Sequence, residues 1–182
     1  MVKTLEKVSI GIDPGLSGAA IALDEYGTIV GCTAMPHVKT RPPYRKHNQR
    51  SVLDINILGT WLSCFEHISA ITIEESAPFG MGVSSAYTSG MNNGRLHSLC
   101  EVWKRANGGG LYLVTAKEWQ AKVIKDQSHE GKWSKEASIE LAVSDHGDYA
   151  LFSKPKKTAD GFADAAHIAA YGWDLVREDW VA

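Results

Sequence analysis

The sequence predicts an α/β fold in which a mixed sheet of five strands is flanked by helices. Three short apolar runs, joined by tight turns, fill the first 35 residues and are typical of a strand meander. Two further apolar runs follow, and a stretch with helical spacing of its apolar residues precedes each of them. The last third of the chain predicts helices. A meander combined with two helix-separated strands favours a mixed sheet.

The first half of the chain predicts four strands and one helix. The segment Glu25-Tyr26-Gly27 predicts a hairpin turn between the second and third strands. Ser51 with Asp54 is typical of an N-cap pair, and it starts a helix with apolar residues at 55, 58, 62 and 65. A loop over residues 36–50 precedes that helix. The strands are expected near 7–13, 18–24, 28–35 and 70–73.

The second half predicts a long helix, a fifth strand and three further helices. The long helix places Ala86, Gly90 and Gly94 at four-residue spacing, which favours close approach to a neighbouring element. Thr115 and Ser134 are the expected caps of the next two helices. The expected ranges are 84–106 for the long helix, 111–114 for the strand, and 115–124, 134–143 and 159 to about 173 or somewhat beyond for the other helices. This order of elements is the ribonuclease H-like arrangement, although order alone also permits other α/β layers.

Length and composition describe one globular domain that spans residues 1–182. Hydrophobic residues make up 44% of the chain and charged residues 22%, as in ordinary globular proteins. No apolar window is long enough to span a bilayer, and the first seven residues lack the apolar core of a signal peptide. Three widely spaced cysteines favour buried thiols in a reducing compartment over disulfides or a zinc site. We therefore expect a cytoplasmic protein with no membrane partner.

The distribution of charge is more informative than the net charge of −2, which argues against a protein that coats nucleic acid by bulk electrostatics. Basic residues gather in the 36–50 loop without any acid, and Lys154-Pro155-Lys156-Lys157 precedes the last expected helix. Such local patches can bind phosphates. A solvated, proline-containing connection is the alternative interpretation of the loop. Its basic residues are Lys39, Arg41, Arg45, Lys46 and Arg50.

Acidic residues lie at three expected element ends, namely the ends of two strands and the start of the last helix. Asp13 ends the first strand and is followed by a glycine-rich turn, and Glu74 ends the fourth strand. Asp160 and Asp164 are four residues apart at the expected start of the last helix, so that both project from one face. The helix dipole in the first turns partly offsets their repulsion, and a divalent cation would offset it far more. An Asp that only initiates a turn is the alternative for Asp13.

Four such carboxylates suit the hydrolysis of a phosphodiester by two metal ions. Two hard cations about 4 Å apart activate the attacking water and stabilise the leaving oxygen. Mg²⁺ requires oxygen ligands, so Asp13 is the expected bridge and Glu74, Asp160 and Asp164 complete the two coordination spheres. His167, one turn beyond Asp164, could be a ligand, a proton-transfer group or a packed core residue.

Four motifs, in order, resemble the RuvC family of Holliday-junction resolvases, most closely its bacteriophage and plant chloroplast members. They are Ile10-Gly11-Ile12-Asp13-Pro14-Gly15 with Ser17-Gly18, then Thr72-Ile73-Glu74, the glycine-striped helix at 85–94, and Asp160-Gly161-Phe162-Ala163-Asp164-Ala165 with its alanine-rich continuation. The resemblance runs from about residue 7 to 173. It implies an RNase H-like fold and a homodimer. It also implies an endonuclease that uses two Mg²⁺ (or Mn²⁺) ions per site and no nucleotide cofactor.

The substrate that the resemblance implies is a four-way DNA junction, nicked symmetrically on two opposed strands in recombination, repair or phage DNA processing. Two symmetric cuts require two active sites related by a two-fold axis. If a phage encodes the protein, the bacterial cytosol is its expected location. The expected DNA contacts are Lys39, Arg41, Arg45, Lys46, Arg50, Lys122, Lys132 and Lys135, with Phe79 and Met81 as wedges against unstacked bases or, alternatively, Phe79 as a core residue.

The chain departs from the family pattern at three places. Glu75 stands where Gln is common, but strand alternation sends it to the face opposite Glu74. The two aspartates are spaced by four rather than three, which leaves open a register in which Asp164 and His167 form the last pair. The 36–50 loop is longer and more basic than expected.

Three other functions remain compatible with parts of this pattern. A nuclease of the same fold could act on flaps, other branched DNA or RNA–DNA hybrids. A sugar-kinase or actin-like phosphotransferase also uses a phosphate-binding turn after its first strand, but it needs a second half that 182 residues do not supply. A non-catalytic junction-binding protein would be expected to lack one or more of the acids.

Overall fold

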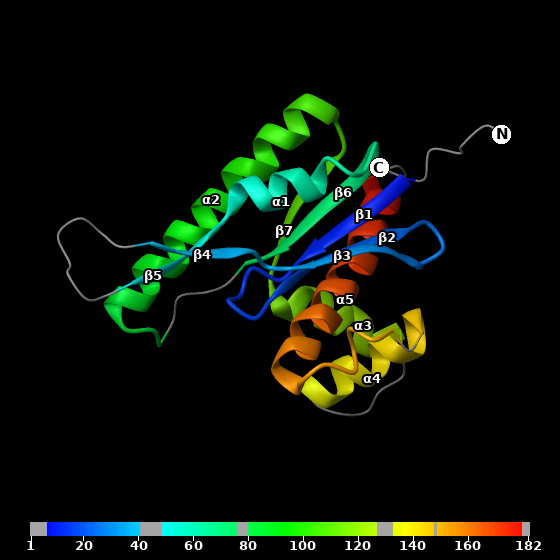
Figure 1. Cartoon of the computed structure of the whole chain (residues 1–182). Helices are drawn as coiled ribbons and strands as arrows, with labels where there is room; N and C mark the ends of the chain where they lie inside the picture. The colour runs from blue at the N-terminus through cyan, green and yellow to red at the C-terminus, as the bar shows by residue number, and fades with distance from the viewer. Residues whose placement is uncertain (1–6, 41–48, 76–79, 127–132, 148, 180–182) are drawn as a thin grey trace.

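The structure is a computed structural model that describes residues 7–40, 49–75, 80–126, 133–147 and 149–179 (Figure 1). Its main sheet has five strands in the order β3-β2-β1-β6-β7. The first three strands are antiparallel, whereas β6 and β7 run parallel to β1. The prediction of a mixed five-stranded sheet is therefore confirmed. The strands are β1 (Lys7–Ile12), β2 (Ala19–Asp24), β3 (Ile29–Ala34), β6 (His67–Glu74) and β7 (Gly110–Val114).

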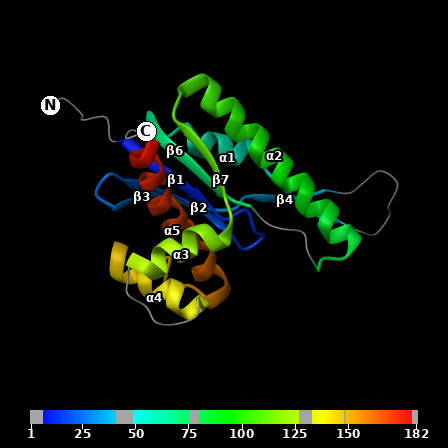
Figure 2. The same cartoon turned by 180° about the vertical axis from the view of Figure 1, so that it is seen from behind.

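Helices cover both faces of this sheet (Figures 1 and 2). One face packs on α1 and α2, through Ile10 and Ile12 of β1 against Leu58 and Leu96. The other face packs on α5, which contacts β1, β2 and β6 and also carries α3 and α4. Asp54 and Ser134 cap α1 and α4 with their side chains. The helices are α1 (Ile55–Leu62), α2 (Val83–Asn107), α3 (Ala116–Asp126), α4 (Lys135–His146) and α5 (Lys156–Asp179).

A two-stranded sheet replaces part of the loop expected at 36–50. Strands β4 (His37–Thr40) and β5 (Arg50–Leu53) pair in antiparallel register, with Val38 opposite Val52. The side chains of Asn92 and Arg95 bind the backbone of Leu53, at 3.0 and 3.2 Å, and so attach β5 to α2. Ser51 therefore belongs to a strand, and only Asp54 caps α1. These long-range bonds from α2 are invisible in the local sequence.

Close packing by small residues occurs at α5 rather than at α2. A Cβ atom on Gly11 of β1 would lie 2.2 Å from the Ala165 carbonyl oxygen, and one on Gly161 would lie 2.3 Å from the Ser17 carbonyl oxygen. The expected close approach at Gly90 and Gly94 of α2 is wrong for the described part of the chain, because a Cβ atom at either position would meet no atom within 4 Å. Helix α5 is thus held directly against β1 and the turn that follows it.

Helix α5 begins at Lys156, three residues before the expected start, and continues to Asp179. The backbone N–H groups of Thr158 and Ala159 bond to the Pro155 carbonyl oxygen, so the basic segment opens the helix instead of preceding it. Asp160 consequently lies beyond the first turn. The helix dipole therefore offsets the repulsion between Asp160 and Asp164 less than expected, because its effect is confined to the terminal turn.

Two further features bear on the expected class of protein. Within the described residues, no helix combines the length and apolar character needed to cross a membrane. The expectation of three buried thiols is correct only for Cys100, because Cys32 and Cys64 are exposed.

Candidate active site

Asp13 and Glu74 lie side by side because they follow paired positions on parallel strands. Ile12, the last residue of β1, pairs with Ile73 of β6, and each acid is the next residue of the chain. Their side chains share the sheet face of Ser9 and Thr72, which lie against α5 at Gly172. The two carboxylates therefore project toward α5.

The turn after β1 fixes the position of Asp13. Its Oδ1 accepts a 2.9 Å hydrogen bond from the Gly15 N–H, and its own N–H donates to the Ala19 carbonyl oxygen at 3.0 Å. A Cβ atom at Gly18 would lie 2.1 Å from the Asp13 carbonyl oxygen, so only glycine fits there without displacing the acid. The glycines of this turn thus allow the backbone to close around the carboxylate.

Glu74, rather than Glu75, belongs to the candidate site. The Nε1–H group of Trp119, a fully buried residue of α3, donates a 2.8 Å hydrogen bond to Oε2 of Glu74. Glu75 is exposed, and its backbone N–H continues the pairing with β7 at the Val114 carbonyl oxygen. Strand alternation separates the two acids, as expected.

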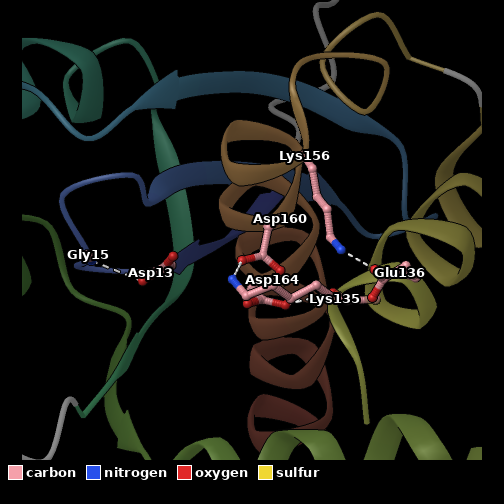
Figure 3. Close-up of polar contacts among 8 residues, drawn as sticks. Asp13, Gly15, Lys135, Glu136, Lys156, Asp160 and Asp164 are labelled. Carbon is pink, nitrogen blue, oxygen red and sulfur yellow. Dashed lines mark hydrogen bonds and ion pairs between the residues drawn. The ribbon is translucent and has the colours of Figure 1, made fainter.

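Asp160 and Asp164 lie one turn apart on the face of α5 that meets α4 (Figure 3). The Lys135 ammonium group of α4 forms an ion pair with Oδ2 of Asp160, whose side chain is only 11% exposed. The Ser138 hydroxyl, one turn further along α4, donates a 2.6 Å hydrogen bond to Oδ1 of Asp164. Each aspartate is therefore held by one residue of α4.

The four carboxylates interact electrostatically. Burial raises the pKa of Asp13, Glu74 and Asp164 above the ordinary value, and for Asp164 the pKa reaches about 7. The negative charge of Asp160 contributes to raising the pKa of Asp13 and of Asp164. The hydrogen bonds from Gly15, Trp119 and Ser138 act in the opposite direction. A cation placed among these groups would relieve both their burial and their repulsion.

The donor set fits a hard divalent cation, since it consists of carboxylate oxygens alone. In the described part of the chain, however, no three Asp, Glu, His or Cys side chains converge closely enough to hold a metal ion. Asp160 is turned to Lys135 and Asp164 to Ser138, which accounts for this arrangement. The assignment of these acids as metal ligands stays a prediction.

His167 is packed in the interior. It is 1% exposed, and its ring lies 6.2 Å from that of Trp119 at an interplanar angle of 16°. Its Nε2 lies 2.9 Å from the Ser138 carbonyl oxygen and therefore carries the proton of that hydrogen bond, because a carbonyl can only accept. Burial lowers the pKa of His167, which favours the neutral ring.

A groove of about 510 Å³ adjoins the turn after Asp13. It lies between that turn, the start of β5 and the first half of α2, and most of its lining side chains carry hydroxyl or amide groups. Arg50 lines it and lies 5.0 Å from the centre of the Tyr87 ring, a cation–π contact. The sequence indicated Arg50 but not the groove. Its polar walls include Ser84, Ser85, Thr88, Ser89, Asn92 and Asn93.

The expected DNA contacts are distributed unequally. Lys39 is exposed on β4 and Lys135 is at the carboxylates, whereas Lys122 pairs with Asp174 at 3.7 Å. Asp174 is ten residues past Asp164, roughly 15 Å along α5, so this ion pair holds Lys122 toward the C-terminal part of that helix. Arg41, Arg45, Lys46, Phe79 and Lys132 lie outside the described residues.

Two residues that touch the carboxylates, Ser138 and Trp119, were not indicated by the sequence. A serine within a helix and a tryptophan near the start of another are common, and neither belongs to a recognisable motif. The only available signal is that Ser138 lies one helical turn after Lys135, which places both on one face of α4.

No protein-family model matches the chain, and no curated protein matches it in sequence. Similar solved structures include RuvC from Thermus thermophilus in complex with a Holliday junction substrate, at a TM-score of 0.55 and 18% identity over 93% of this chain and 97% of that chain. Another T. thermophilus RuvC structure gives a TM-score of 0.51 and a sequence identity of 17%, with the same coverage of both chains. The yeast mitochondrial Holliday junction resolvase Ydc2 superposes more loosely, with a TM-score of 0.44 and a sequence identity of 11%. That match covers 97% of this chain and 89% of that chain. The likeness to T. thermophilus RuvC establishes the fold, and this chain therefore has the RNase H-like fold of RuvC.

Proposed function

We propose that this protein is a metal-dependent, structure-selective endonuclease that resolves four-way DNA junctions by paired nicks. The observation that carries the proposal is the electrostatic coupling of four acids. Asp13 and Glu74 follow paired positions at the ends of β1 and β6, on the sheet face that packs against α5, and α5 bears Asp160 and Asp164. This combination on the fold of RuvC supports nuclease chemistry more than a binding role, because a binding protein has no need for mutually repelling, half-buried carboxylates.

The four acids are the proposed metal ligands, and Lys135 is their proposed counter-charge. Asp13, fixed by its turn, is the expected bridge between two cations, and Glu74, Asp160 and Asp164 are the expected outer ligands. When bound, the cations would supply a water of lowered pKa and a counter-charge for the leaving oxygen. Lys135 neutralises Asp160 in their absence, and its exposed stem allows it to turn toward a phosphate.

The groove beside Asp13 supports a path for the DNA strand. Its hydroxyl and amide groups can bind phosphate and sugar oxygens, and Arg50 adds a positive charge at its edge. Lys39 extends the basic surface along the β4–β5 sheet. We infer that one arm of the junction lies along this sheet while the scissile strand enters the groove.

A homodimer follows from the proposed reaction, because two symmetric nicks require two sites. The open glycine stripe of α2, at Gly90 and Gly94, is the face at which we expect the two copies to meet. Light scattering should give twice the mass of one chain. Gly94→Arg should halve that mass and abolish paired nicking, and an unchanged mass would place the interface elsewhere.

The decisive experiment uses a synthetic mobile four-way junction, a flap, an RNA–DNA hybrid and a linear duplex of matched length. With Mg²⁺, the protein should nick the junction at two opposed positions and leave the duplex intact. Glu74→Gln should retain junction binding but lose cleavage, whereas Glu75→Gln, which changes the adjacent exposed acid, should cleave normally.

Each alternative gives a different result. Preferred cleavage of the flap or the hybrid would assign the chain to another branch of RNase H-like nucleases. Junction binding without any cleavage, over a range of Mg²⁺ and Mn²⁺ concentrations, would indicate a non-catalytic junction-binding protein. Full activity in Asp13→Asn would exclude the proposed active site.

A further inference from the structure

We propose that Trp119 is a positioning residue, whose indole N–H holds the Glu74 carboxylate in the orientation that the active site requires. The inference rests on the proposed function, because it assigns Trp119 a role through a residue of that site. Nothing in the motif pattern indicates it, since Trp119 is distant in sequence from all four acids.

The contact joins a flexible acid to a rigid donor. Glu74 is the last residue of β6, and its side chain has three rotatable bonds that the strand itself does not fix. The indole Nε1 of Trp119 lies 2.8 Å from Oε2, a normal charge-assisted hydrogen bond. The bond uses one carboxylate oxygen, so the other can serve a further ligand.

The indole is immobilised by a cluster of rings from three segments. Trp119 is 0% exposed, the Trp133 ring meets it edge-on at 5.1 Å, and the His167 ring is stacked against it at 6.2 Å. His167 is in turn fixed by its hydrogen bond to the Ser138 carbonyl oxygen. A donor surrounded in this way cannot follow Glu74, so Glu74 must adopt the orientation that the donor sets.

The partner of this indole distinguishes positioning from simple packing. A buried indole N–H is satisfied equally well by a backbone carbonyl, and Trp173 illustrates this, because its Nε1 donates to the Asp24 carbonyl oxygen at 2.9 Å. Trp119 instead donates to a side chain at the candidate active site. Groups that orient metal-binding carboxylates typically change metal affinity by about 10- to 100-fold when they are removed.

The first test is spectroscopic and needs no cleavage. In protein labelled with ¹⁵N-tryptophan, the indole resonance that is absent in Trp119→Phe identifies this N–H. It should shift in Glu74→Gln and should shift saturably as Mg²⁺ is added to the wild-type protein. The Trp173 indole resonance should not move. A Trp119 resonance that is unaffected by Glu74→Gln would refute the hydrogen bond.

The second test separates positioning from packing. Trp119→Phe keeps an aromatic ring but removes the donor, whereas Trp133→Phe alters the same ring cluster and keeps the Trp119 donor. Trp119→Phe should raise the Mg²⁺ concentration for half-maximal junction cleavage about tenfold, with junction affinity unchanged and with recovery of the rate at high Mg²⁺. Trp133→Phe should leave that Mg²⁺ concentration within about twofold of wild type.

The outcomes separate this inference from the proposed function. If Trp119→Phe and Trp133→Phe needed the same Mg²⁺ concentration for half-maximal cleavage, Trp119 would only pack in the core and would not position Glu74. If the wild-type protein cleaves no junction, the proposed function fails. The Mg²⁺-dependent shift of the Trp119 resonance still decides whether Trp119 reports on a metal bound at Glu74, and its absence in wild type would then refute the inference as well.

Discussion

The Ser138 hydroxyl donates a 2.6 Å hydrogen bond to Oδ1 of Asp164, and this bond couples α4 to the acidic face of α5. Ser138 is fully buried, and its carbonyl oxygen also accepts from His167. Lys135, one turn earlier on α4, pairs with Asp160. One face of α4 therefore controls both aspartates, and the properties of the candidate site depend on a helix that contributes no acid to it.

Removing the Ser138 hydroxyl should destabilise the ionised form of Asp164. Ser138→Ala is expected to lower the free energy of unfolding by about 1–2 kcal/mol at pH 8, because a hydrogen bond to a buried charge is lost. At pH 5 the folded protein holds Asp164 protonated, so the loss should be smaller. Urea unfolding in EDTA at both pH values measures the difference. Ser144→Ala, an exposed change on the same helix, is the control, and equal losses at the two pH values would contradict the assignment.

Asp164→Asn should stabilise the metal-free protein at alkaline pH. The pKa of Asp164 is raised from 3.8 to about 7 in the folded protein, so the folded state binds the proton more tightly than the unfolded chain. The tighter binding of this proton stabilises the folded state fully below pH 4, and the stabilisation is lost as the pH rises from about 4 to 7. Asparagine does not ionise, so the variant avoids the cost of a buried negative charge at position 164 and should be more stable than wild type at pH 8.

The expected gain at pH 8 is about 1–2 kcal/mol, after allowance for relaxation of the neighbouring acids. It should shrink as the pH falls toward 4. Addition of Mg²⁺ should stabilise wild type but not the variant, which should also lose cleavage. A variant that is less stable than wild type at pH 8 would show that the ionised Asp164 is well tolerated in the fold.

Lys135 and a divalent cation should compete for Asp160. Lys135→Met removes the resident positive charge, so the Mg²⁺ concentration for half-saturation should fall several-fold, as measured by calorimetry without DNA. The metal-free variant should lose only about 1 kcal/mol of stability, because the Lys135 side chain is 62% exposed. Lys156→Met is the matched control, since Lys156 pairs with the exposed Glu136. Weaker Mg²⁺ binding in Lys135→Met would mean that the lysine supports the metal site instead.

The sequence predicted those parts of the site that depend on local patterns. Strand alternation separated Glu74 from Glu75, and four-residue spacing placed Asp160 and Asp164 on one helix face, as the structure shows. The partners of these acids could not be predicted, because Trp119 and Ser138 meet them only after α3 and α4 pack on α5. The β4–β5 sheet was missed for the same reason, since Asn92 and Arg95 of α2 attach β5 to the rest of the fold through long-range hydrogen bonds.

The contact between β1 and α5 determines how far Asp13 lies from the two aspartates, and glycine makes that contact possible. In Gly11→Ala, the new Cβ would lie 2.2 Å from the Ala165 carbonyl oxygen, so α5 must move away from the strand. We expect a loss of about 2–3 kcal/mol of stability together with loss of cleavage. Gly59→Ala is the control, because its Cβ would lie 3.4 Å from the end of the Leu99 side chain, an ordinary van der Waals contact. Gly59 is within α1, so this variant should gain about 0.5–1 kcal/mol from its higher helix propensity. Urea unfolding and junction cleavage measure both variants. If Gly11→Ala were as stable and active as Gly59→Ala, the close packing of α5 on β1 would not be what sets the position of Asp13 relative to Asp160 and Asp164.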